Sequence, residues 1–113
     1  MKYNFLYAPE FLKAVKALAK RYPSLKSDLQ EFRCSLEQNP EQGVDLGNGV
    51  RKIRMTIKSK GRGKSGGARV ITCNIMVSCS EMNIAFLYIY DKADTSSIKN
   101  EAIIQIRKNL GVQ

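Results

Sequence analysis

Residues 50–58, with the sequence VRKIRMTIK, alternate strictly between apolar and polar side chains after the first two positions. Side chains of a β-strand point to opposite faces in turn, so this stretch predicts a strand with two chemically different faces. The apolar face holds Ile53, Met55 and Ile57. The opposite face holds Lys52, Arg54, Thr56 and Lys58. The pattern therefore predicts a row of basic groups on the side of a sheet that faces away from the core.

The charge of the chain is concentrated around this strand. The chain has a formal net charge of +9, and residues 51–69, called the basic segment below, hold eight basic side chains and no acidic one. A solvated loop is the plain interpretation, but eight like charges repel, and a polyanion would relieve the repulsion. Nucleic acid is favoured over an anionic membrane surface, because phosphates release counterions on binding and no amphipathic helix accompanies the segment.

The rest of the chain predicts an α+β domain that spans residues 1–113. Apolar spacing predicts a strand over 2–7, helices over 9–22 and 24–38, a loop over 41–49, strands over 68–78 and 82–90, and a final helix from 98 to 110. The order β-α-α-β-β-β-α favours an antiparallel sheet with the two N-terminal helices packed on one face. The side chains expected between these helices and the face with Ile53 and Met55 are Val15, Leu18, Leu29, Phe32 and Leu36.

Several function classes are excluded by composition. The chain of 113 residues contains no histidine, so His-based triads, His metal ligands and an imidazole base are ruled out. Its three cysteines form no C-x-x-C pair, which predicts buried free thiols and neither a disulfide framework nor a zinc site. No stretch predicts a signal peptide or a membrane span. We expect a cytoplasmic protein that uses no metal and no small-molecule cofactor.

The segment GRGKSG at 61–66 matches the dinucleotide-binding pattern G-x-G-x-x-G in letters only. That fingerprint needs a strand before it and a helix after it, whereas a β-branched run follows here. A phosphate-binding loop of the G-x-x-x-x-G-K-S type fails for the same reason, and Lys58 stands at its first glycine. The segment is better interpreted as a basic loop whose glycines let the backbone approach phosphates.

Arg69 opens an apolar strand directly after this loop. It is either one half of a structural ion pair or a phosphate ligand that acts with Lys52 and Arg54 from the neighbouring strand, because arginine suits bidentate phosphate contact. Tyr90, at the end of the last strand, is either core or a platform on which a base stacks. Lys92 leaves the same strand end and is a further candidate for the anion site.

Three stretches together resemble the RelE/ParE toxin superfamily, and within it the HigB-like branch: GVRKIR at 49–54, KSKGRGKSGGARVI at 58–71 and LYIYDK at 87–92. The resemblance implies a RelE-like fold and the toxin of a bacterial type II toxin–antitoxin system. Such a toxin is an mRNA endoribonuclease that acts on the ribosome, inhibits translation and is held inactive by a cognate antitoxin. The cut would come from metal-independent attack by the RNA 2′-OH on its own phosphate.

By matching position, the resemblance assigns catalytic roles to Lys52, Arg54, Arg69 and Lys92. Relatives carry an arginine and a tyrosine where this chain has Ala93 and about Lys99. Lys60, Arg62 or Lys64 is expected to replace the arginine and Tyr90 to replace the stacking tyrosine. Together with Lys58, these are the residues expected to bind RNA. Two rival functions remain open: inhibition of DNA gyrase, as in ParE-type toxins, and non-catalytic binding of nucleic acid.

Overall fold

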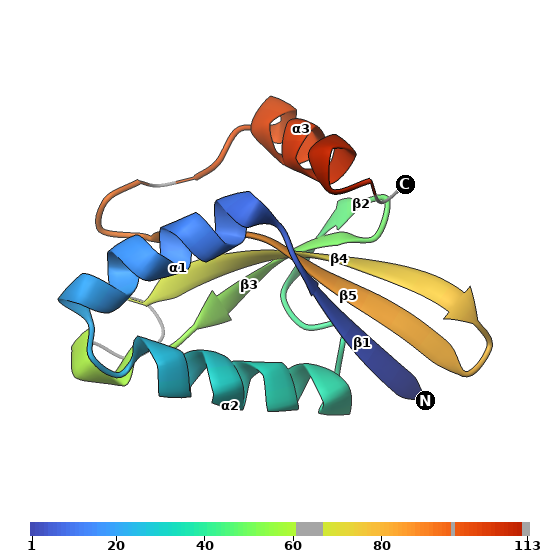
Figure 1. Ribbon diagram of the computed structural model, residues 1–113, viewed down its shortest axis with the longest axis horizontal. Helices are drawn as coiled ribbons and strands as arrows, with labels where there is room; N and C mark the ends of the chain where they lie inside the picture. The colour runs from blue at the N-terminus through green and yellow to red at the C-terminus, as the bar shows by residue number, and fades with distance from the viewer. Residues whose placement is uncertain (61–66, 96, 112–113) are drawn as a thin grey trace.

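The computed structural model describes residues 1–60, 67–95 and 97–111, and Figure 1 shows the helices and strands of these parts. In chain order they are β1 (Lys2–Tyr7), α1 (Pro9–Arg21), α2 (Leu25–Gln38), β2 (Val44–Gly47), β3 (Val50–Met55), the 3-10 helix η1 (Lys58–Lys60), β4 (Ala68–Ser78), β5 (Glu81–Asp91) and α3 (Asn100–Leu110). The predicted α+β class is confirmed, as are both N-terminal helices and the C-terminal helix.

The five strands form one sheet in the order β1-β5-β4-β3-β2. The prediction of an antiparallel sheet holds for β2 to β5 but is wrong for β1, which pairs with β5 in parallel. The reason is topological. The chain leaves β1 into the two helices and re-enters the sheet at its other edge, so no tight hairpin constrains the direction of β1.

The predicted loop over 41–49 contains a short strand, β2, that pairs antiparallel with β3. The turn between them uses positive φ angles at Gly47, Asn48 and Gly49 (91°, 54° and 80°). A side chain on Gly49 would also lie 2.5 Å from the carbonyl oxygen of Asn74, so glycine is required there.

Strand β3 is shorter than the predicted strand over 50–58 and ends at Met55. Beyond it, the Lys58 amide donates to the carboxylate of Asp28 (3.1 Å), and the Ser59 amide donates to the hydroxyl of Ser24 (2.9 Å). These two bonds draw the chain away from the sheet toward the start of α2, where η1 forms.

The two faces of the sheet carry different layers. Helices α1 and α2 cover the face that bears Ile53, Met55 and Ile57, and Figure 1 shows α2 and α3 on opposite sides of the sheet. Ile53 is 2% exposed and Arg54 is exposed, which confirms the predicted alternation. Leu18, Phe32 and Leu36 are buried as predicted, whereas Val15 and Leu29 are only partly buried against the core.

Two smaller points concern thiols and membranes. Cys73 is buried as predicted, but Cys34 and Cys79 are exposed, because Cys34 lies on the outer side of α2 and Cys79 in the β4–β5 turn. Within the parts of the chain given above, no helix is long and apolar enough to cross a membrane.

Candidate nucleic-acid interface

A row of three polar side chains crosses the sheet on the face opposite α1 and α2. Arg54 of β3 is the direct cross-strand partner of Arg69 of β4, and Arg69 is in turn the partner of Tyr90 of β5. Directly opposed residues have Cβ atoms about 5 Å apart and share a face. The next row holds Lys52, Ile71 and Tyr88 in the same way. Antiparallel register thus places Lys52, Arg54, Arg69 and Tyr90 on one face, as the sequence predicted for Lys52 and Arg54 and offered as one of two alternatives for Arg69.

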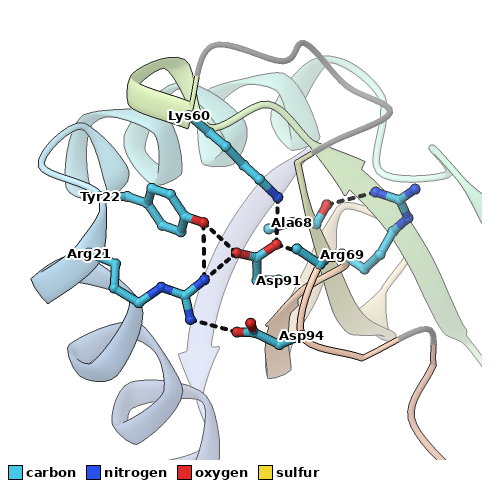
Figure 2. Close-up of polar contacts among 8 residues, drawn as sticks. Arg21, Tyr22, Lys60, Ala68, Arg69, Asp91 and Asp94 are labelled. Atoms are coloured by element: carbon cyan, nitrogen blue, oxygen red, sulfur yellow. Dashed lines mark hydrogen bonds and ion pairs between the residues drawn. The ribbon is translucent and has the colours of Figure 1, made fainter.

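Arg69 is 6% exposed. Its guanidinium donates to the carbonyl oxygen of Ala68 at 3.3 Å, as Figure 2 shows. Among the described residues, no carboxylate lies within 4.0 Å of it, so the alternative of a structural ion pair finds no partner there. A buried guanidinium without a carboxylate retains donors for a ligand anion.

Tyr90 lies beside Arg69 and is 4% exposed. Its hydroxyl is buried and has no hydrogen-bond partner in the part of the chain that the structure describes. Burial raises the pKa of the Tyr90 phenol, and nearby Arg69 offsets part of that rise, so the group is a neutral donor at pH 7. The ring is largely covered, whereas Tyr88, with its ring centroid 6.5 Å away, is partly exposed.

Lys58 and Lys60, two of the other predicted RNA-binding residues, are each held in an ion pair. Lys58 forms an ion pair with Glu31 of α2 (2.6 Å) in which both side chains are 62% exposed. Lys60 forms an ion pair with Asp91 (2.5 Å), and its side chain is largely buried. Arg62 and Lys64 lie outside the described residues. Just before β4 the backbone passes close to the end of β3, because a Cβ on Gly67 would lie 2.2 Å from the carbonyl oxygen of Met55.

Lys92 follows the last residue of β5 and is exposed. It sits inside a turn in which the Ala93 amide donates to the carboxylate of Asp91 (2.9 Å). Ala93 is exposed in the same turn, and Lys99 is the exposed N-cap residue of α3. Neither residue supplies the arginine or tyrosine that the resemblance leads one to expect at these places.

Asp91 is the polar residue that sequence reasoning missed. Its side chain is fully buried at the end of β5, where it meets Arg21, Tyr22 and Lys60 (Figure 2). Burial alone would raise the pKa of Asp91, but hydrogen bonds from Lys60, Tyr22 and the Ala93 amide hold it below its ordinary value. The available signal was an acid at the end of an otherwise apolar strand, next to Lys92.

Comparison with known proteins gives the family of the chain. The family model described as the RelE toxin of the RelE/RelB toxin–antitoxin system matches residues 27–111, which include most of α2 and all of β3, β4, β5 and α3. The search of curated proteins found no match. The matched range covers most of the 113 residues and every residue of the row described above. The chain therefore belongs to the RelE toxin family.

Proposed function

We propose that the chain is a ribosome-dependent mRNA endoribonuclease of the HigB-like branch, which inhibits translation in the cytoplasm until its antitoxin binds. The observation that carries the proposal is the direct opposition of Arg54 and Arg69, without a carboxylate within 4.0 Å of either in the described residues. Like charges that face each other across two strands destabilise a sheet. An RNA phosphate between them would turn that repulsion into binding.

The proposed chemistry needs only the RNA and basic side chains. The 2′-oxygen of one nucleotide forms a bond to the adjacent phosphorus while the bond from phosphorus to the 5′-oxygen breaks. The products are a 2′,3′-cyclic phosphate and a 5′-hydroxyl. Negative charge builds on the phosphate oxygens in the transition state, and arginines held in place by the sheet stabilise it there.

Each proposed catalytic residue has a role that follows from its chemistry. Arg69 and Arg54 contact the phosphate oxygens, because guanidinium stays charged at all relevant pH values. Lys52 and Lys92 handle the protons, one taking the proton of the 2′-OH and the other giving one to the leaving 5′-oxygen. Tyr90 donates a hydrogen bond from its hydroxyl, which its burial suits better than base stacking.

The two described lysines of the proposed RNA-binding set, Lys58 and Lys60, differ in the strength of their ion pairs. The Lys58–Glu31 pair is open to water on both sides, so it is weak and an RNA phosphate can displace Glu31. Lys60 is bound to a buried carboxylate, and its departure would leave that buried charge with one partner fewer, which is energetically costly. We therefore expect Lys58, with Arg62 and Lys64 of the same basic segment, to meet RNA first.

The test is 5′-end mapping of cellular transcripts after brief expression. Cells receive the parent chain, Arg69→Ala, or Lys13→Ala, which removes an exposed lysine of α1 as a matched control. We expect new 5′ ends within translated frames for the parent and for Lys13→Ala, and none for Arg69→Ala. DNA breaks without new RNA ends would instead indicate a gyrase inhibitor, and an absence of both would leave a binding protein.

A further inference from the structure

The carboxylate of Asp91 joins two parts of the molecule through its two oxygens. Oδ2 accepts from Arg21 (2.7 Å) and from the hydroxyl of Tyr22 (2.5 Å), both at the end of α1. Oδ1 accepts from Lys60 (2.5 Å) and from the backbone amide of Ala93 (2.9 Å). With four donors on two oxygens and no exposure of the side chain, Asp91 has no capacity left for RNA.

The bond from Ala93 closes a turn around Lys92. An aspartate that accepts from the amide two residues later forms a local turn of defined shape. The Asp91 carbonyl oxygen strengthens it by accepting from the amides of Asp94 (2.9 Å) and Thr95 (3.2 Å). The backbone of Lys92 is thus fixed by the residue before it.

The same aspartate ties this turn to the strand that carries Arg69. Asp91 is the cross-strand partner of Ala68, the residue directly before Arg69. Lys60, the last residue of η1, also binds the Asp91 carboxylate. Arg69 and Lys92 therefore each follow one member of the Ala68–Asp91 pair, and the Asp91 carboxylate closes the turn on the Lys92 side.

We infer that Asp91 is a positioning residue for the reaction proposed above: it holds Lys92 at a fixed place relative to Arg69 through the turn that its Oδ1 closes. This inference rests on the proposed function, because it assigns Lys92 to proton transfer. Misplacement of a catalytic group by about 1 Å costs about 100-fold in rate. A loose turn should therefore lower kcat and leave the binding of RNA nearly unchanged.

Three variants separate this role from plain stability. Asp91→Asn keeps an oxygen for Lys60 and Ala93 but loses the charge that Arg21 needs. Asp91→Ala loses all four bonds. Asp28→Ala is the matched control, because Asp28 is also buried and bonds to Ser24 and the Lys58 amide, away from Lys92.

The measurements are kcat and KM for cleavage of mRNA on purified translating ribosomes, below the unfolding transition of the least stable variant. We expect all three variants to unfold more easily than the parent. Only Asp91→Ala should lose kcat, by about 100-fold with little change in KM, and Asp91→Asn should keep kcat within about tenfold of the parent. Equal kcat in Asp91→Ala and Asp28→Ala would overturn the inference while the nuclease function stands.

A second readout does not depend on cleavage. Hydrogen exchange of the Ala93 amide, followed by NMR, should be slow in the parent, Asp91→Asn and Asp28→Ala, and fast in Asp91→Ala. If the parent does not cleave RNA, the proposed function fails, and this measurement still decides whether Asp91 holds the turn. Slow exchange in Asp91→Ala would show that the turn forms without the carboxylate and would overturn the inference.

Discussion

Arg54 and Arg69 face each other directly across strands β3 and β4, on the sheet face opposite α1 and α2. Fold stability gives no reason for this pairing, since like charges in directly opposed positions weaken a sheet. A site that binds an anion does give a reason. The proposed function would account for the pairing, and removal of either arginine should then lower activity without lowering stability.

Arg69→Ala should abolish toxicity and leave the fold intact. Loss of one charged contact to the transition state costs about 3–4 kcal/mol, or two to three decades in rate. Stability should stay the same or rise slightly, because the repulsion with Arg54 disappears. The measurements are growth after induction and the midpoint of thermal unfolding. Full toxicity in the variant would mean that Arg69 is structural.

Tyr90→Phe removes one hydroxyl and should affect RNA cleavage without destabilising the fold. The Tyr90 hydroxyl is buried without a partner in the described residues, and a buried unsatisfied group costs about 1–3 kcal/mol. We expect the variant to be as stable as the parent or more so, and to cleave RNA more slowly. Urea unfolding and single-turnover cleavage give the two numbers. A destabilised variant with unchanged cleavage would show that the hydroxyl serves the fold.

Stability should depend on pH through Asp91. Its pKa is lower in the folded chain than in the unfolded chain, so the folded state binds its proton less readily. The resulting stabilisation is complete above the unfolded pKa of about 3.9 and is lost as pH falls through the folded value. Urea unfolding between pH 7 and pH 2 should show a loss on the acid side that is smaller in Asp91→Asn. Identical curves for the two chains would remove Asp91 as the source.

The sequence predicted the features of the fold that depend on local patterns and missed those that depend on contacts between distant parts of the chain. Apolar residues recur with the period of a strand in β3 and with that of a helix in α1 and α2. The period in β3 places Ile53 and Arg54 on the correct faces. Strand β2 was missed because its four residues are all exposed and show no burial pattern. The direction of β1 was missed because periodicity carries no information about which strand is the neighbour.

The candidate site was predictable in part for the same reason. Lys52 and Arg54 follow from strand alternation, Arg69 stood out as a lone arginine at the start of an apolar strand, and the resemblance named all three. The role of Asp91 depends on partners 31, 69 and 70 residues away in the sequence, which no local pattern indicates. Lys60 was assigned to RNA because it lies in the basic segment, whereas the fold pairs it with that aspartate.

The antitoxin should bind through a surface that is acidic and apolar and that covers Lys52, Arg54 and Arg69. The reason is that residues 51–69 carry eight basic and no acidic side chains, and the rest of the chain is almost neutral. Opposite charges accelerate association, and salt screens them. Stopped-flow association with the product of the neighbouring gene should therefore slow as ionic strength rises. A rate independent of salt, with the basic strand open in the complex, would contradict this.

The most direct test of the account is cleavage of a defined mRNA by the purified chain, with and without ribosomes that carry that mRNA in the decoding site. Denaturing gels report the cut, and mass spectrometry of the fragments reports the chemistry of the new ends. We expect cutting on the ribosome only, with a 2′,3′-cyclic phosphate on one fragment and a 5′-hydroxyl on the other, and no cutting by Arg69→Ala. Intact mRNA in both reactions, with the folded parent chain present at excess, would contradict the account.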